Sequence, residues 1–131
     1  MEPRIGLHHV ALRCRDLERC ERFYREVIGL EVLRRWPADG GGDRSVWLAL
    51  DGGRGFLALE RAESEGGGQP ADAAPAGWHV VALSISRRDR SRWEDRLAGL
   101  GVEIDRKTQW SLFLRDPEGN RLALSHWPEA S

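Results

Sequence analysis

The sequence contains an internal repeat, and this repeat limits the folds open to the chain more than any other feature. Residues 28–32 (IGLEV) recur as residues 100–104 (LGVEI), and residues 51–59 (DGGRGFLAL) recur as residues 116–124 (DPEGNRLAL). The offsets are 72 and 65 residues, and a longer loop near residues 37–43 in the first copy accounts for the difference. A repeat of this length predicts two similar supersecondary units that share one core.

Each copy has the hydrophobic periodicity and turn residues of a βαβββ module. Asp16 suits a helix N-cap, and Gly29 suits the position just after the end of that helix. The predicted elements of the first copy are a strand at 7–14, a helix at 17–28 and strands at 30–36, 44–50 and 55–61. Those of the second copy are a strand at 79–86, a helix at 88–99 and strands at 102–106, 109–115 and 120–126. We therefore predict an α+β fold in a single domain, residues 1–131, with module one at 5–61, a Gly/Pro/Ala-rich linker at 62–77 and module two at 78–127.

Alternation along the strands separates two faces in each module. The apolar face should pack under the helices; it comprises Val10, Leu12, Cys14, Val46, Leu48, Leu50, Leu57 and Leu59, then Val81, Leu83, Ile85, Phe113, Leu122 and Leu124. The opposite face carries His9, Ala11, Arg13, Trp47, Ala49, Phe56, Ala58 and Glu60, then Val80, Ala82, Ser84, Trp110, Leu112, Ala123 and Ser125. This mixture of small, aromatic and a few polar residues is typical of a ligand pocket, although a partner subunit could also cover such a face.

Composition and charge argue against several classes of partner. The formal net charge of −1 provides no basic surface for nucleic acid, and no apolar run approaches the ~20 residues that span a bilayer. The two cysteines, Cys14 and Cys20, fit buried free thiols better than a disulfide. Because the N-terminus also lacks the apolar segment of a secretory signal, we expect a cytoplasmic protein with no nucleic-acid or membrane partner.

Several segments resemble a known family. They are residues 8–12 (HHVAL), 16–19 (DLER), 23–24 (FY), 29–32 (GLEV) and the closing turn at 116–121 (DPEGNR). Together they resemble the vicinal oxygen chelate (VOC) superfamily, which includes glyoxalase I, extradiol dioxygenases, methylmalonyl-CoA epimerase, fosfomycin-resistance enzymes and bleomycin-binding proteins. The resemblance implies tandem βαβββ modules whose curved mixed sheets enclose a cavity, often within a homodimer.

The resemblance also implies a metal site, for which this chain lacks most of the ligands. Metal-dependent members use a histidine and a glutamate from each module, and these four positions fall on His9, Ala58, Val80 and Ala123. Only the imidazole can coordinate a metal, and catalytic metal sites generally have three protein ligands. We therefore expect no cofactor. The alternative is a displaced site of His9, His79 and Glu60 that holds Zn, Ni, Mn or Fe.

The residues that remain on the predicted cavity face suggest small-molecule binding. Trp47 and Trp110 are interpreted as corresponding residues of the two modules, and with Arg13 nearby they would suit a flat or apolar ligand that carries an anionic group. The predicted ligand pocket comprises His9, Arg13, Trp47, Ala58, Glu60, Val80, Trp110, Ala123 and Ser125, and no catalytic residue is assigned. His8 and His126 are expected to be exposed at strand ends.

Three functions are open on this reasoning. The first is a glyoxalase/bleomycin-resistance-like protein with a degenerate metal site that binds a small hydrophobic or aromatic ligand. The second is a metal-dependent lyase, isomerase or dioxygenase with a displaced metal site. The third is a structural or interaction module whose sheet face is covered in a dimer. We favour the first because the metal-binding carboxylates are absent, and whether the protein is an enzyme stays open.

Overall fold

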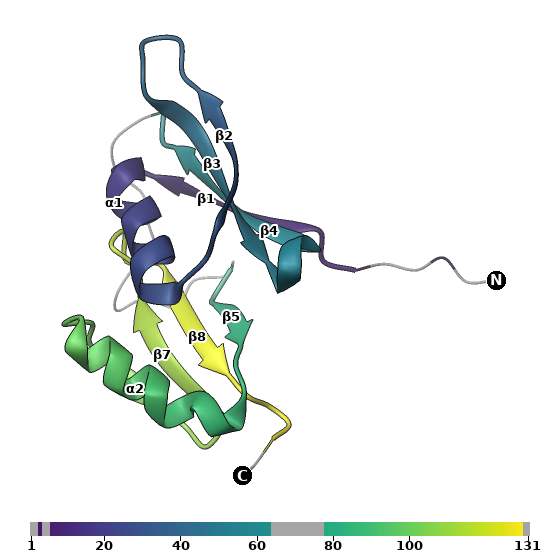
Figure 1. Ribbon diagram of the computed structural model, residues 1–131, viewed down its shortest axis with the longest axis vertical. Coiled ribbons are helices and arrows are strands. Elements are labelled where there is room, and N and C mark those ends of the chain that lie inside the picture. Colours follow the sequence, from purple (N-terminus) through teal and green to yellow (C-terminus); the bar gives the residue numbers. More distant parts are fainter. Residues whose placement is uncertain (1–2, 4–5, 64–77, 130–131) are drawn as a thin grey trace. The chain divides into compact units, whose positions relative to one another are not determined.

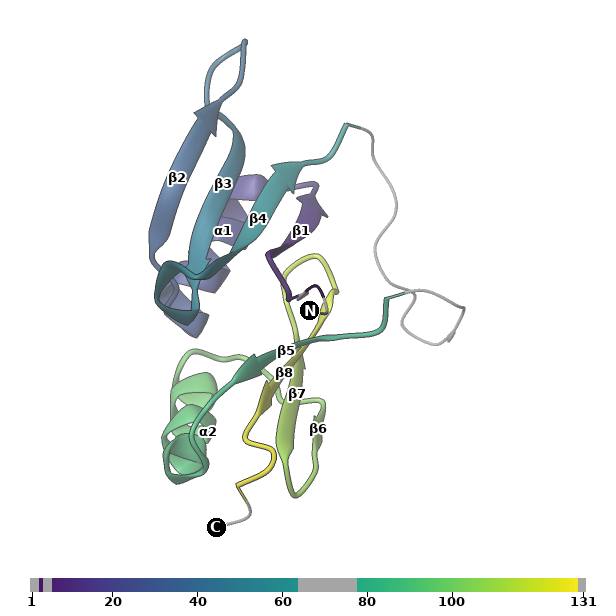
Figure 2. The same ribbon diagram turned by 90° about the vertical axis from the view of Figure 1, so that its right-hand side faces the viewer.

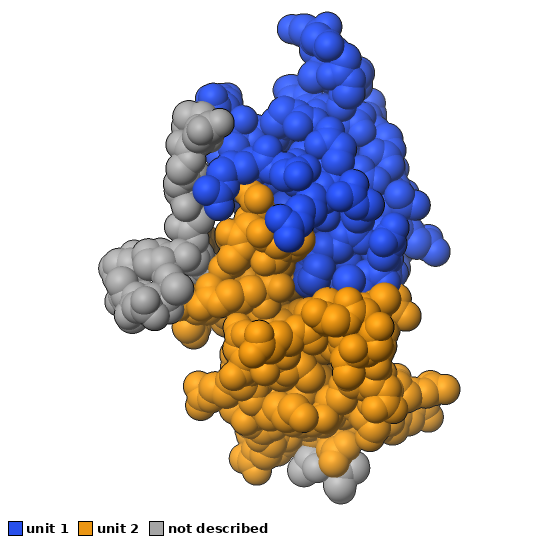
Figure 3. Space-filling view, turned by 90° about the vertical axis from the view of Figure 1, so that its left-hand side faces the viewer, with its two compact units in different colours: residues 1–65 blue, residues 66–131 orange. Residues whose placement is uncertain are grey.

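The computed structural model describes residues 3, 6–63 and 78–129. The chain divides into two compact units, residues 1–65 and 66–131 (Figure 3). Each unit contains one four-stranded mixed sheet and one main helix, which confirms the predicted α+β fold with tandem βαβββ modules. The predicted linker at 62–77 lies outside the described residues apart from Ala62 and Glu63. In the described part of the chain, no helix is long and apolar enough to cross a membrane.

Unit 1 follows the predicted order of elements (Figure 1). They are strand β1 (His9–Cys14), helix α1 (Leu17–Arg22), the π-helical segment η1 (Phe23–Ile28), strands β2 (Val32–Pro37) and β3 (Asp43–Leu50), the 3₁₀ turn η2 (Asp51–Gly53) and strand β4 (Gly55–Arg61). The sheet order is β1-β4-β3-β2, with β1 parallel to β4 and the other pairs antiparallel. Because a parallel pair needs a long crossover connection, α1 is carried across one face of the sheet.

Helix α1 and segment η1 lie on the apolar face of this sheet (Figure 2). The helix begins where the Asp16 carboxylate accepts a hydrogen bond from the Arg19 N–H at 3.1 Å, and η1 ends at Gly29, whose φ is +92°. The buried side chains are Leu17, Cys20, Tyr24 and Ile28 from the helix, and Cys14, Val46, Leu48, Leu57 and Leu59 from the sheet. The apolar face predicted for the first module is therefore the core of unit 1.

Unit 2 repeats this topology in residues 78–129 (Figure 2). Its elements are strand β5 (Val81–Ser84), the 3₁₀ turn η3 (Arg87–Asp89), helix α2 (Arg90–Gly99) and strands β6 (Arg106–Lys107), β7 (Ser111–Arg115) and β8 (Arg121–Ser125). The sheet order is β5-β8-β7-β6, with β5 parallel to β8. Strand β6 is shorter than predicted because the Val102 N–H bonds to the Leu97 carbonyl at 2.8 Å, which makes that residue part of the helix end.

The end of α2 also differs from the prediction. Leu97 is fully buried as expected, and Trp93 is partly exposed. Leu100 was predicted to point inward, but it is 50% exposed. It follows the last helical residue, and its N–H bonds to the carbonyls of Arg96 and Leu97, which tightens the last turn. The side chain consequently leaves the apolar stripe that periodicity alone assigned to it.

The two faces of strand β7 are the reverse of those predicted. Phe113 lies directly opposite Ala123, and Leu112 lies opposite Leu124. Because paired residues share a face, Phe113 belongs to the face of Ala123, and Leu112 joins the buried face. The prediction was wrong because both side chains are large and apolar, so that hydrophobicity could not choose between them, and a shift of one residue exchanges the faces.

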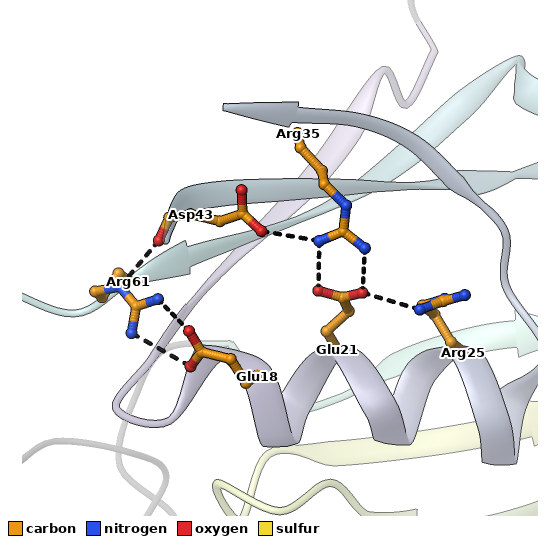
Figure 4. Close-up of polar contacts among 6 residues, drawn as sticks. All are labelled: Glu18, Glu21, Arg25, Arg35, Asp43 and Arg61. Carbon is orange, nitrogen blue, oxygen red and sulfur yellow. Dashed lines mark hydrogen bonds and ion pairs between the residues drawn. The ribbon is translucent and has the colours of Figure 1, made fainter. Parts of the chain in front are cut away.

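Salt bridges tie α1 to the strands of unit 1 (Figure 4). The Glu21 carboxylate accepts hydrogen bonds from the Arg35 guanidinium of β2 at 2.8 and 2.6 Å and from Arg25 at 3.1 Å. One turn earlier, the Glu18 carboxylate accepts a bond from Arg61 of β4 at 2.6 Å. Hydrogen bonds from these arginines lower the pKa of both glutamates. The side chain of Glu21 is 12% exposed and that of Glu18 is 58% exposed, so we expect Glu21 to contribute more to stability.

Replacing Glu21 with glutamine should lower the free energy of unfolding at pH 7 by about 1–3 kcal/mol, because a nearly buried charged hydrogen-bond pair is lost. The folded-state pKa of Glu21 is depressed, so its contribution is present above the unfolded pKa and disappears as the pH falls through the folded pKa. The difference between the two proteins should therefore shrink at acidic pH in urea titrations. Glu18→Gln is the matched control, and a loss above about 1 kcal/mol there would contradict this ranking.

A second polar contact joins α2 to the end of β8 in unit 2. His126, predicted to be exposed, is only 2% exposed. Its Nδ1 lies 2.7 Å from the Glu129 carbonyl oxygen, which can only accept, so Nδ1 carries the proton and Nε2 accepts from Arg90 at 3.0 Å. The same guanidinium donates to the Thr108 carbonyl at 2.8 Å. The histidine therefore connects three segments of unit 2.

Arg90→Met should lower the free energy of unfolding by about 1–3 kcal/mol, because it leaves buried acceptors on His126 and Thr108 unpaired. Arg92→Met on the same helix is the control: the Arg92 side chain is 84% exposed, and we expect a change within about 0.5 kcal/mol. Chemical denaturation of both variants would measure the difference. Equal losses would mean that the contacts of Arg90 are not stabilising.

Candidate functional site

The face of the unit 1 sheet opposite α1 brings together the site residues predicted in the first module. Three rows of side chains cross it. They are His9, Phe56 and Ala49; then Ala11, Ala58, Trp47 and Arg34; then Arg13, Glu60, Ser45 and Trp36. We call these eleven residues the site face. Its members from β1, β3 and β4 have the register that simple alternation predicted, because those strands run without a bulge.

Four aromatic rings are in contact along the site face. The His9 ring is stacked on Phe56 with centroids 4.6 Å apart and planes at 1°, and Phe56 is stacked on Trp47 at 4.3 Å and 20°. Trp47 then meets Trp36 edge to face at 5.3 Å. The guanidinium of Arg34 lies 3.8 Å from the centroid of Trp36. We call this continuous series, from β1 to β2, the ring ladder.

Sequence reasoning missed two members of the ring ladder as site residues. Phe56 was placed on the correct face but left out of the pocket, and Trp36 was not assigned to a face. Strand β2 has register shifts between Val32 and Arg34 and after Trp36, so counting alternate residues through it gives no reliable face. The pairing of Trp36 with Ser45 places the indole beside the other rings. Six tryptophans in 131 residues was the one signal that could have prompted a search for such a cluster.

The position where the family resemblance places a first-module glutamate is filled by a methyl group. Ala58 lies directly opposite Ala11 on one side and Trp47 on the other, and it is 2% exposed. A glutamate at this point would put a carboxylate among aromatic rings. With alanine there, the centre of the site face is apolar and offers no oxygen ligand.

The alternative metal site is also not favoured by the register. His9 pairs with Phe56 of β4, so that Glu60 is four residues further along, roughly 13 Å at the usual rise of a strand. The His9 Nδ1 is engaged with the Nδ1 of His8 at 2.9 Å. Within the described residues, no group of three histidine, cysteine, aspartate or glutamate side chains is placed to hold a metal ion. These donors do not fit the metal centre that the fold family implies, and we derive no chemistry through one.

The unit 2 sheet carries the remaining predicted residues in a different environment. Ala123, opposite Phe113, is 2% exposed and is the counterpart of Ala58. Ser125 is hydrogen-bonded through its hydroxyl to that of Ser111. Val80 precedes β5 and is partly exposed, and His79 beside it is exposed. By register, Phe113 rather than Trp110 is the counterpart of Trp47.

Trp110 lies on the other side of the unit 2 sheet from Phe113. Its ring contacts Trp127 at 4.7 Å and the buried His126 at 6.2 Å, and its carbonyl accepts from the His126 N–H at 2.9 Å. The predicted pairing of Trp47 with Trp110 as equivalent residues is therefore wrong. The two tryptophans differ by 63 residues in number, whereas the sheet registers relate the modules by offsets of 65 and 66.

Comparisons with known proteins agree with this fold. The family model of the Glyoxalase/Bleomycin resistance protein/Dioxygenase superfamily matches residues 6–124. The chain is 31% identical over 119 residues to a catechol-2,3-dioxygenase of Bacillus subtilis, with 88% of this chain covered but only 39% of the length of that protein. It is 30% identical over 130 residues to the uncharacterized protein PA2024 of Pseudomonas aeruginosa, with 92% and 87% covered.

A solved structure gives the same result at the level of the fold. The lactoylglutathione lyase of Agrobacterium tumefaciens superposes with a TM-score of 0.73 at 23% identity, covering 98% of this chain and 100% of that one. The family match spans most of the sequence and the tandem modules have the expected strand order. This chain belongs to the Glyoxalase/Bleomycin resistance protein/Dioxygenase superfamily.

Proposed function

We propose that this protein binds a flat aromatic or hydrophobic small molecule on the site face of unit 1. The observation that carries the proposal is the ring ladder, in which His9, Phe56, Trp47 and Trp36 are in successive contact. Aromatic pairs contribute about 0.5–1.5 kcal/mol beyond the area they bury, and a planar ligand can stack on an exposed ring in the same way. The buried methyl of Ala58 keeps the centre of this surface apolar.

Charge at the two edges of the site face adds a preference for the ligand. Arg13 on β1 and Arg34 on β2 are exposed, whereas the rings between them are uncharged at neutral pH apart from the titratable His9. Guanidinium groups recognise carboxylate and phosphate through paired N–H donors. An aromatic ligand with an anionic substituent would therefore gain from either edge.

The names of relatives support an aromatic ligand class. Two curated relatives from Bacillus subtilis are named as a catechol-2,3-dioxygenase and a putative ring-cleaving dioxygenase. This chain spans about two fifths of the length of each, so their activity is not carried over. The recognition of an aromatic ring is the part of that chemistry that the site face can supply without a metal.

A metal-dependent reaction is the competing proposal, because a fosfomycin-resistance relative of Listeria monocytogenes has been crystallised with Mn(II). Its 16% identity to this chain shows the fold alone. Ala58 and Ala123 occupy the two positions at which the family resemblance places glutamates. The donor set of this chain therefore favours ligand binding over chelate chemistry.

Self-association is a second candidate function. Trp78 is 95% exposed and Trp127 is 69% exposed, and large exposed aromatic side chains are enriched at protein interfaces. Light scattering across a range of concentrations would test it. A monomer at all concentrations, unchanged by Trp127→Ser, would remove a homodimer from consideration.

Trp47→Ala should weaken the binding of naphthalene, used as a simple planar probe, by about tenfold, because the central stacking partner is lost. Trp110→Ala, on the buried side of the unit 2 sheet, should leave the affinity unchanged. Quenching of tryptophan fluorescence, checked by calorimetry, would measure both. If naphthalene does not bind the wild type, or binds Trp47→Ala equally well, the proposed function is wrong.

Purified protein incubated with Zn, Ni, Mn or Fe(II) should retain far less than one metal ion per chain by elemental analysis, because a lone imidazole is a weak site. Loading near one equivalent that His9→Ala abolishes would instead support the metal-dependent alternative. Loading that His9→Ala leaves intact would indicate adventitious surface binding.

A further inference from the structure

One row of the site face contains two buried polar atoms that lack hydrogen-bond partners. Arg13, Glu60, Ser45 and Trp36 lie side by side across β1, β4, β3 and β2. The Ser45 hydroxyl and the Trp36 indole nitrogen are buried without a partner among the described residues, and Ser45 is 2% exposed. We call these four residues the polar row. Because unpaired buried polar groups are unfavourable and uncommon, this adjacent pair needs an explanation.

The second unit shows how the same hydroxyl is satisfied when no ligand needs it. Ser111 is the register counterpart of Ser45, and Ser125 is the counterpart of Glu60. In unit 2 the two serine hydroxyls bond to one another across the strands. In unit 1 the equivalent partner is a carboxylate, and the Ser45 hydroxyl is left unpaired. The repeat thus contains a closed version and an open version of one polar row.

The donors and acceptors of the polar row define the group it can take. The Trp36 indole nitrogen can only donate, so its partner must be an acceptor. The Ser45 hydroxyl can join it in donating to the same acceptor, and the ionised Glu60 carboxylate next along the row can only accept. A carboxamide presents a carbonyl acceptor beside an N–H donor, which matches this order.

We propose that the polar row recognises the carboxamide group of an aromatic carboxamide whose ring stacks on Trp47 and Phe56. The ligand carbonyl accepts from Trp36 and Ser45, and the ligand N–H donates to Glu60. Both protein atoms are covered in the structure, so the partly exposed Trp36 indole turns about its side-chain bonds to admit the carbonyl. This inference rests on the proposed aromatic binding and adds the polar specificity to it.

Binding of 2-naphthamide, 2-naphthoate and naphthalene tests the inference, because the three probes share a ring and differ in the polar group. We expect 2-naphthamide to bind at least tenfold more tightly than naphthalene and more tightly than 2-naphthoate, which places a negative charge beside Glu60. Ser45→Ala and Glu60→Gln should each reduce the preference for the amide over naphthalene several-fold. Ser111→Ala, in the closed row of unit 2, should leave that preference unchanged.

The outcomes separate this inference from the proposed function. Equal binding of 2-naphthamide and naphthalene would overturn the polar row while leaving ring stacking intact, as would an equal effect of Ser45→Ala and Ser111→Ala. Failure of all three probes to bind would overturn the stacking surface and the polar row together. In ¹⁵N spectra of the indole groups, the Trp36 signal, assigned with Trp36→Phe, should move with 2-naphthamide and not with naphthalene.

Stability without ligand provides an independent test. Because the Ser45 hydroxyl has no partner to lose, Ser45→Ala should unfold at the same or a higher denaturant concentration than the wild type. Ser111→Ala should unfold at a lower concentration, because it removes a hydrogen bond and orphans Ser125. If Ser45→Ala is destabilised as much as Ser111→Ala, the hydroxyl has an internal partner and the inference is wrong.

Discussion

The parallel pairing of the first and last strands of each module is the constraint on which the rest of the structure depends. It joins β1 to β4 and β5 to β8, and it requires the helix between them to cross one face of the sheet. That crossing commits one set of alternate side chains to the core. The other set, on the opposite face, is then available for a function, and the register of β1 against β4 decides which residues meet there.

The two modules use this common plan for different purposes. Positions that face one another in the same register hold Trp47 and Ala58 in unit 1, and Phe113 and Ala123 in unit 2. Their neighbours diverge: Phe56, a member of the ring ladder, corresponds to Arg121. The backbone is conserved between the repeats while the chemistry of the face is not, which is why we assign the ligand surface to unit 1.

Each module also fixes its helix with polar contacts of its own. In unit 1 the Glu21 carboxylate receives the Arg35 guanidinium of β2, and in unit 2 Arg90 of α2 bonds to the buried His126. Such contacts have defined geometry, unlike the apolar packing beneath them, so they restrict the angle at which each helix crosses its sheet. The site face is therefore supported by a helix held from the other side.

The sequence by itself determined the tandem βαβββ modules, the buried face of unit 1 and the set His9, Arg13, Trp47, Ala58 and Glu60 on one face, because the repeat and strict alternation in unbulged strands fix these features. Only the tertiary structure decided the face of Phe113, the burial of His126 and the place of Trp36. A one-residue shift in register, a partner from another element or a β-bulge controls each of these, and none of the three leaves a local pattern in the chain.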